Sequence, residues 1–203
     1  MASSARGSRT EPSSERRDQI LAIAAHLIAQ RGYSATTVRD IADEAGILSG
    51  SLYHHFPSKE AILQEILRSF LTGLRERFSA IVAEGLSPRE TLDRLIAHAF
   101  HTIESKPDQV GLYQNELSFL GSQPGFEFLH EERVQIEELW IEQFREGQRV
   151  GDFRTTVDPA IAYRFYRDAV WSTVAWYRPG RGHTVESLIG NFLDLVHNGL
   201  LAD

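Results

Sequence analysis

Residues 36–60 read TTVRDIADEAGILSGSLYHHFPSKE, and this stretch decides the fold. Thr37 is followed three residues later by Asp40, which predicts the start of a short helix because the two side chains can form a capping box. Gly46 ends this helix. Four apolar residues would form its inward face: Val38, Ile41, Ala42 and Ala45. A tight turn and a second short helix follow, so the stretch predicts helix-turn-helix geometry.

The second helix, of about seven residues, has few side chains to place in a core. Ser49 is its expected cap, and it ends before Pro57 because the residue preceding a proline avoids the helical region. Leu52 and Phe56, one turn apart, can anchor it. Its outer surface would then carry Ser51, Tyr53, His54 and His55. Small and polar residues at its start would let main-chain amides and hydroxyls approach phosphates in a DNA groove.

Lys59 falls in the first turn of the next helix, which Ser58 begins. A cation at this place is disfavoured by the helix dipole, by roughly a few tenths of a kcal/mol. A phosphate lying between the ammonium and the helix would make the position favourable. The alternative is a pair of ordinary core helices joined by a turn, since such pairs are common in helical proteins. The geometry alone leaves both interpretations open.

The residue types narrow this choice. The stretch from Thr37 to Glu60 resembles, almost position for position, the DNA-binding signature of the TetR (tetracycline-repressor) family. The resemblance implies an all-α fold with three N-terminal helices, a long connecting fourth helix, and a helical ligand-binding and dimerisation part. It implies that six residues lie at DNA, the first three at phosphates and the others at the groove: Thr37, Tyr53, Lys59, Ser49, Ser51 and His54. Which of them contacts bases stays open.

The rest of the chain has helical apolar spacing almost throughout, without an alternating strand pattern or a repeat. Helix starts are predicted at Ser87-Pro88, Asp158-Pro159 and Thr184. The sequence therefore predicts an all-α protein of about nine helices. We expect three parts: a disordered basic arm over 1–13, a helix-turn-helix DNA-binding domain over 14–58, and an effector-binding and dimerisation domain over 59–203.

Four arginines near the N-terminus bear on DNA binding: Arg6, Arg9, Arg16 and Arg17. They could place an arm along the DNA backbone or in its minor groove. A solvated tail is the alternative.

The net charge of −7 over 203 residues is unevenly distributed. Residues 1–60 hold seven basic and seven acidic side chains, whereas residues 61–203 hold 14 and 21, which indicates different partners for the two parts.

There is no cysteine, which excludes disulfides, thiolate catalysis and cysteine-ligated metals. No stretch approaches the roughly 18–20 apolar residues of a membrane span, and the polar N-terminus lacks a signal-peptide core. We therefore expect a soluble cytoplasmic protein with no membrane partner.

A competing class of function is a small helical enzyme or metal-binding protein. His98, His101 and Glu104 follow one another at three-residue intervals on one predicted helix and could ligate a metal. An amphipathic helix edge explains the same residues, and the spacing is less regular than that of a zincin pair. The sequence has no nucleophile elbow, P-loop or dinucleotide fingerprint, so we expect no catalytic residue, no metal and no cofactor.

A predicted helix over 159–177 has apolar residues around much of its circumference, which indicates burial on more than one side. Arg167 and Asp168 lie within that pattern, and a buried arginine is costly unless it is paired. Either Asp168 neutralises the arginine, or the arginine awaits an anionic or carbonyl-bearing ligand. Trp171 lies four residues from Arg167 and therefore on the same face of the helix.

Three segments resemble one actinobacterial branch of the family, the KstR-type repressors of the ring-degrading steps of cholesterol catabolism: 47–56, 164–168 and 176–180. The resemblance implies a repressor that is released from its operator by a CoA thioester of a partly degraded sterol ring. It also implies that Arg167 and Trp171 contact this ligand. A regulator of other lipid or efflux genes, with a different hydrophobic ligand, is the alternative, and an activator role stays open.

The last predicted helix, over 184–201, has a wide apolar stripe that includes Leu193 and Val196. The family resemblance implies a homodimer in which this helix and the helix over 159–177 pack against their symmetry mates. Two recognition helices would then lie about one turn of DNA, roughly 34–36 Å, apart on a palindromic operator.

Overall fold

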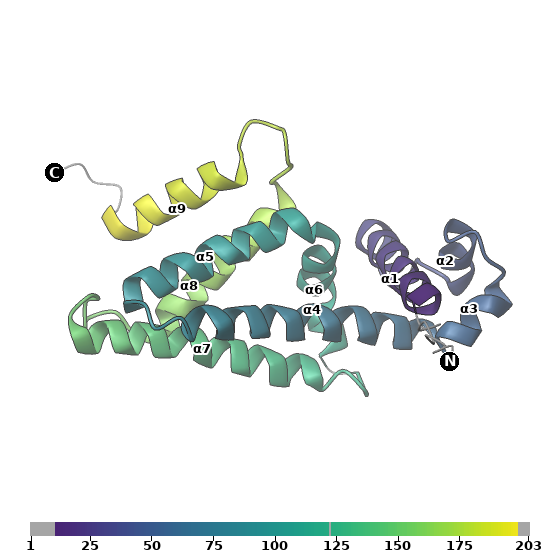
Figure 1. The fold of residues 1–203 in the computed structure, drawn as a ribbon, viewed down its shortest axis with the longest axis horizontal. Helices are drawn as coiled ribbons and strands as arrows, with labels where there is room; N and C mark the ends of the chain where they lie inside the picture. The colour runs from purple at the N-terminus through teal and green to yellow at the C-terminus, as the bar shows by residue number, and fades with distance from the viewer. Residues whose placement is uncertain (1–10, 122, 199–203) are drawn as a thin grey trace, which may run out of the picture. The chain divides into compact units, whose positions relative to one another are not determined.

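The computed structural model describes residues 11–121 and 123–198, and all regular secondary structure in these residues is helical (Figure 1). The chain forms two compact units, Met1–Leu67 and Arg68–Asp203. The first unit contains α1 (Glu11–Arg31), α2 (Val38–Glu44), α3 (Ser49–His55) and the start of α4 (Lys59–Val82). The second contains the rest of α4 with α5 (Pro88–Ser105), α6 (Pro107–Leu120), α7 (Phe128–Val150), α8 (Pro159–Trp171), the short 3₁₀ helix η1 (Ser172–Ala175) and α9 (Val185–Asn198). The all-α prediction is confirmed, and none of these helices is long and apolar enough to cross a membrane.

The boundaries of the parts differ somewhat from those expected. The division between the two units falls within α4, after Leu67, whereas the sequence placed it at residue 58. α1 begins at Glu11, inside the stretch expected to be an arm, and Pro12 is compatible with the first turn of a helix. Residues 1–10 of the expected arm lie outside the described residues.

α2 and α3 are fixed by the residues that the sequence indicated. Thr37 Oγ1 accepts a hydrogen bond from the Asp40 amide (3.1 Å) and Asp40 Oδ2 accepts one from the Thr37 amide (2.8 Å), which completes the capping box. Gly46 follows α2 in the left-handed conformation, with φ of 66°, where a side chain would be strained. Leu52 and Phe56 are completely buried in the core of the first unit. Figure 1 shows α1, α2 and α3 as a three-helix group.

Ser49 is not the cap of α3, and this prediction is wrong by one residue. The N-cap residue is Leu48, with extended φ of −70° and ψ of 143°, and no side chain caps the helix. The Leu48 carbonyl accepts hydrogen bonds from the amides of Ser51 and Leu52 (2.9 and 3.2 Å). The reason is the tightness of the turn: the Ile47 amide bonds back to α2 and its side chain packs on the core, so the chain becomes helical one residue early.

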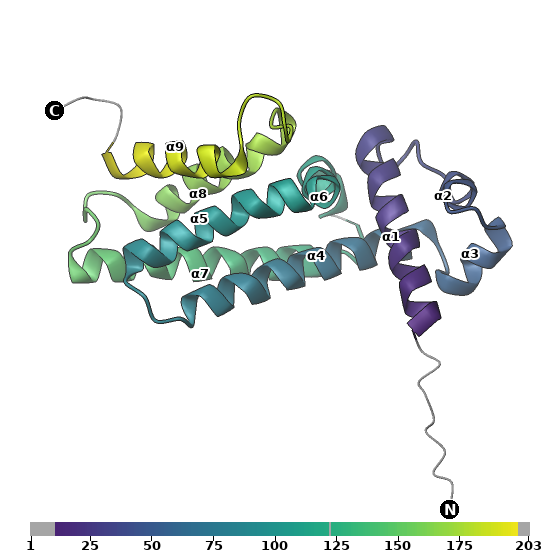
Figure 2. The same cartoon turned by 45° about the horizontal axis from the view of Figure 1, so that its top comes forward.

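α5 is the central helix of the second unit and packs against α6, α7, α8 and α9. Figure 2 shows α9 lying along α5. α5 begins with the predicted capping box between Ser87 and Glu90, and Pro88 occupies its first turn. Phe78 and Trp140 meet edge to face in the core, with ring centroids 5.5 Å apart.

The helix predicted over 159–177 is shorter in the structure. It starts where expected, because the Asp158 side chain accepts a hydrogen bond from a first-turn amide, but the α-helical part ends at Trp171. The Thr173 hydroxyl donates to the Val170 carbonyl (2.7 Å), a local bond that competes with α-helical hydrogen bonding. The chain therefore continues as the 3₁₀ helix η1.

α9 begins after Thr184 as predicted, since the Thr184 hydroxyl oxygen accepts a hydrogen bond from the Ser187 amide (3.2 Å). It is described as far as Asn198. Residues 199–201 of the predicted last helix lie outside the described residues.

Candidate DNA-binding face and ligand cavity

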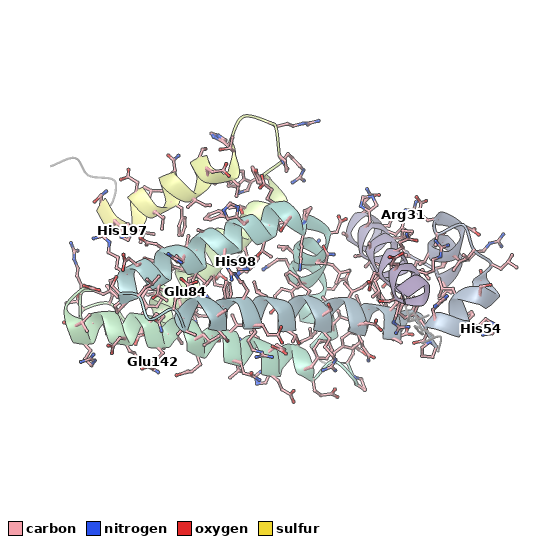
Figure 3. All side chains as sticks on the ribbon, in the orientation of Figure 1. Arg31, His54, Glu84, His98, Glu142 and His197 are labelled. Atoms are coloured by element: carbon pink, nitrogen blue, oxygen red, sulfur yellow. The ribbon has the colours of Figure 1, made fainter. Side chains whose placement is uncertain are left out.

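α3 buries its apolar side and exposes polar groups. Leu52 has no exposed surface, whereas Tyr53 is 53% exposed and His54 is exposed on the same helix (Figure 3). Ser49 and Ser51 are half-buried. The helix thus offers hydroxyl, phenol and imidazole groups to a partner, and these groups suit hydrogen bonding to phosphates and base edges.

Lys59 holds the turn between α1 and α2. Its Nζ donates to the main-chain carbonyls of Tyr33 and Thr36 (2.7 and 2.8 Å) and lies 4.0 Å from the centre of the Tyr33 ring. The Tyr33 hydroxyl in turn donates to Glu60 (2.8 Å), a hydrogen bond that lowers the pKa of Glu60. This positioning role could not be predicted from the sequence, because no local spacing rule links residues so far apart in the chain.

Two consecutive arginines of α1 bind the carbonyl ends of the helix-turn-helix. Arg16 Nη2 donates to the carbonyl of Ala45, the residue that ends α2 (2.6 Å). Arg17 Nη1 donates to the carbonyl of His55, the last residue of α3 (2.5 Å). Cations at helix C-termini are favourable because they meet unpaired carbonyl groups. Arg16 and Arg17 therefore belong to the folded unit and not to an arm, and the other two arginines of the expected arm lie outside the described residues.

The second unit contains a cavity of about 290 Å³, and both Arg167 and Trp171 line it. Most of the wall is apolar or aromatic: Phe70, Leu71, Leu74, Tyr113, Ile136 and Tyr163. Arg133 of α7 adds a second guanidinium to the lining. Arg133 was not predicted, because it stands among several glutamates in a strongly charged stretch, and no local pattern there indicates a cavity. An apolar cavity with a few polar groups is typical of a small-molecule site.

Arg167 is half-buried and paired. Its Nε lies 2.8 Å from Asp168 Oδ1, and this hydrogen-bonded carboxylate raises the pKa of Arg167. The Asp168 side chain is 68% exposed, so this is not a desolvated ion pair. Arg167 therefore has the predicted neutralising partner, and it also lines the cavity.

His98, His101 and Glu104 do not converge on one point. The His98 ring packs edge to face with Phe78, with centroids 5.7 Å apart, and burial lowers the pKa of His98 to about 4. His101 is exposed, and Glu104 accepts a hydrogen bond from the Tyr177 hydroxyl (2.7 Å). Within the part of the chain that the structure describes, no group of three His, Asp or Glu residues could hold a metal ion.

α8 and α9 carry exposed apolar side chains. Ile161 and Phe165, one turn apart on α8, are 51% and 70% exposed, so the burial predicted on more than one side of this helix is not provided by the single chain. Leu195 of α9 is exposed, and Leu193 and Val196 are half-buried. Exposed apolar groups on neighbouring helices mark a surface that a partner can cover.

Family models match both units of the chain. Residues 20–66 match the family described as bacterial regulatory proteins, tetR family, and residues 85–200 match the tetracyclin repressor-like C-terminal domain. The chain is 46% identical over 191 residues to the HTH-type transcriptional repressor KstR2 of Rhodococcus jostii, with 94% of each protein covered. The structure of the ketosteroid transcriptional regulator KstR2 of Mycobacterium tuberculosis matches with a TM-score of 0.87 at 43% identity, over 93% of this chain and 96% of that one. These relatives are transcriptional regulators and not enzymes. With both units matched and repressors as relatives over most of its length, the chain belongs to the TetR family of DNA-binding transcriptional regulators.

Proposed function

We propose that this protein is a homodimeric repressor that binds a palindromic operator and is released from it by a small-molecule effector. The observation that carries the effector part is the cavity in which Arg133, Arg167 and Trp171 share a mostly apolar wall. One relative is described as a ketosteroid transcriptional regulator, which supports a ligand derived from a steroid. We infer that the effector is a CoA thioester of a sterol-ring degradation intermediate. The regulated genes would serve cholesterol and steroid catabolism, and the protein would act in the cytoplasm.

The cavity fits the ring part of such a ligand. Its volume of about 290 Å³ lies at the lower end of the roughly 300–1,000 Å³ found for ligand pockets. It has room for a compact ring system but not for the CoA carrier as well, so the carrier would extend outside it. The guanidinium of Arg167 offers several fixed donors for carbonyl or thioester oxygens. The indole of Trp171 offers a broad apolar wall and one donor.

The operator contacts follow from the helix-turn-helix. We assign Thr37, Tyr53 and Lys59 to phosphates, which position the protein on the duplex without reading its sequence. Lys59 donates to two carbonyls, and an ammonium has a third N–H group for a phosphate oxygen. The groove would be contacted by the remaining assigned residues, Ser49, Ser51 and His54.

A second copy of the chain is the proposed partner of α8 and α9. Ile161 and Phe165 would form the centre of the dimer interface, flanked by Leu193, Leu195 and Val196. A two-fold axis through this surface brings the same residues of both copies together. Effector binding would favour a dimer whose recognition helices no longer match the operator. Operator binding would in turn lower the affinity for the effector by the same factor as the effector lowers the affinity for the operator.

The proposal is tested by releasing the protein from DNA. The purified protein selects a duplex from a random-sequence DNA pool, and the affinity for that duplex is then measured while a CoA thioester of a sterol-ring acid is added. Free CoA and the free ring acid are the controls. We expect release by the thioester alone, and native mass spectrometry should show one thioester per protomer. Release by an unrelated hydrophobic ligand, with the thioester inactive, would refute the effector but not the repressor function.

A further inference from the structure

Leu48, the residue before α3, is not explained by the fold. Its side chain is 79% exposed, the largest exposed fraction among the large apolar residues that the structure describes. It occupies the N-cap position and makes no side-chain hydrogen bond to the helix. Ser, Thr, Asp or Asn at an N-cap would satisfy one of the unpaired amides of the first turn. At this one position the folded chain therefore lacks two stabilising contributions, the burial of a leucine side chain and a side-chain cap of the helix.

The surface next to Leu48 is open. The three residues that follow are small, Ser49, Gly50 and Ser51. A Cβ atom built on Gly50 meets no atom within 4 Å other than those of its chain neighbours and of the nearby backbone of α3. Two of these three residues are the ones assigned to the DNA groove. A base edge that approaches Ser49 and Ser51 therefore comes close to Leu48 as well, without a bulky neighbour in the way.

The chemistry of leucine limits what Leu48 can recognise. A leucine side chain has no donor or acceptor, so it gains nothing from a phosphate or from the polar edge of a base. The apolar feature of the major groove is the C5-methyl group of thymine. We propose that Leu48 packs against a thymine methyl in each half-site and makes thymine the preferred base there. This inference rests on operator binding by α3, and it explains why a local folding rule is broken at a functional surface.

Two substitutions separate recognition from folding. Leu48→Ser supplies a capping hydroxyl and should raise the melting temperature, while it removes the apolar contact. Leu48→Ala removes the contact without supplying a strong cap. Val134→Ala is the matched control, because Val134 is a 46% exposed apolar residue of α7 in the other unit.

The readout is the affinity for operators in which thymines are replaced, one at a time in each half-site, by deoxyuridine, which lacks the methyl group. The wild-type protein and Val134→Ala should lose about fourfold per half-site at one position, the factor expected for burying one methyl-sized group. Leu48→Ser and Leu48→Ala should bind the thymine and uracil operators equally. Leu48→Ser should combine this loss of discrimination with the higher melting temperature, a pair of opposite changes that a purely structural role does not produce.

Three results would overturn the assignment of Leu48 while operator binding stands: a wild-type protein indifferent to every replacement, a thymine preference that survives Leu48→Ser, and a selected half-site without thymine. A purified protein that selects no sequence from the random DNA pool would instead contradict the proposed function itself.

Discussion

Arg17 of α1 and Glu65 of α4 form a two-point ion pair, in which Arg17 Nε lies 2.8 Å from Oε1 and Nη2 lies 2.5 Å from Oε2 of Glu65. The remaining Nη1 donates to the His55 carbonyl at the end of α3, and the guanidinium lies 4.1 Å from the centre of the Phe56 ring. The hydrogen-bonded carboxylate raises the pKa of Arg17. One planar, five-donor side chain thus joins two helices to the end of the recognition helix, which a lysine could not do with the same geometry.

Arg17→Met should lower the free energy of unfolding by about 1–2 kcal/mol and weaken operator binding. The loss stays moderate because the paired side chains are 38% and 35% exposed, so water replaces part of what is removed. Arg17→Lys should recover only part of it, since an ammonium cannot make all three bonds. Thermal unfolding and fluorescence anisotropy with labelled operator measure the two effects. Arg16→Met, which removes the hydrogen bond to the Ala45 carbonyl, is the control and should lower the free energy of unfolding by less. Equal decreases in the two variants would mean that the ion pair with Glu65 adds no stability of its own.

The capping boxes at Thr37 and Ser87 could be predicted from the sequence because each joins residues three apart, and such local rules are independent of the rest of the fold. The buried anchors Leu52 and Phe56 follow from helical periodicity in the same way. The end of α8 is different, because the hydroxyl of Thr173 decides it against an apolar pattern that continues.

The long-range contacts could not be predicted. Arg17 and Glu65 are 48 positions apart, and their pairing depends on how α1 crosses the start of α4. The position of Arg133 at the cavity could not be predicted either, because its neighbours in the sequence do not indicate which helices pack opposite α7. The spacing of Arg167 and Trp171 did place both on one face, and that face proved to line the cavity.

The pH dependence of stability should contain a contribution from His98. Burial, followed by the charges of Arg77, His101 and Lys106, lowers the pKa of His98 to about 4 from its ordinary value of 6.5. The unfolded chain then takes up the proton at a higher pH than the folded chain. Stability is therefore fully present above about pH 6.5 and falls as the pH drops towards 4.

His98→Phe should flatten this slope, because the substitution keeps an aromatic ring against Phe78 and has no proton to bind. Melting temperatures between pH 7 and pH 4.5 measure the effect, with exposed His101→Gln as the control. A slope in His98→Phe as steep as that of the wild type would assign the acid sensitivity to other groups.

Phe165→Arg should dissociate the proposed dimer without unfolding the chain. Phe165 is 70% exposed in the single chain, so the core of the protomer does not depend on this side chain. A partner subunit, however, would desolvate a charge placed at this position. We expect a helical monomer in light scattering with at least about tenfold weaker operator binding, since one half-site gives too few contacts. Leu193→Arg should do the same with some loss of stability, because Leu193 is half-buried. Val134→Arg is the exposed control, and an unchanged dimer mass in Phe165→Arg would place the interface elsewhere.

Arg167→Met and Trp171→Leu should impair the response to the effector more than they impair folding. Loss of Arg167 leaves Asp168 without its partner, but that side chain is 68% exposed and water can solvate it, so we expect a stability change below about 1 kcal/mol. A lost charge-assisted hydrogen bond to the ligand costs about 1.5–3 kcal/mol, which is one to two decades in affinity. Arg167→Met should therefore bind operator like the wild type and need about 10–100 times more CoA thioester for release. Trp171→Leu, which removes part of the cavity wall, should also need more thioester while it keeps the operator affinity.

Three measurements on the same preparations decide between ligand binding and a structural role for this pair: the melting temperature, the operator affinity in the absence of ligand, and the thioester concentration for half-release. A shift in the third alone places Arg167 and Trp171 in contact with the effector. A lower melting temperature and a weaker operator affinity, together with a shifted release concentration, would mean that the ion pair to Asp168 and the indole hold α8 in place, because a weakened scaffold reduces every function of the unit. A normal release concentration in both variants would remove the two residues from the effector site.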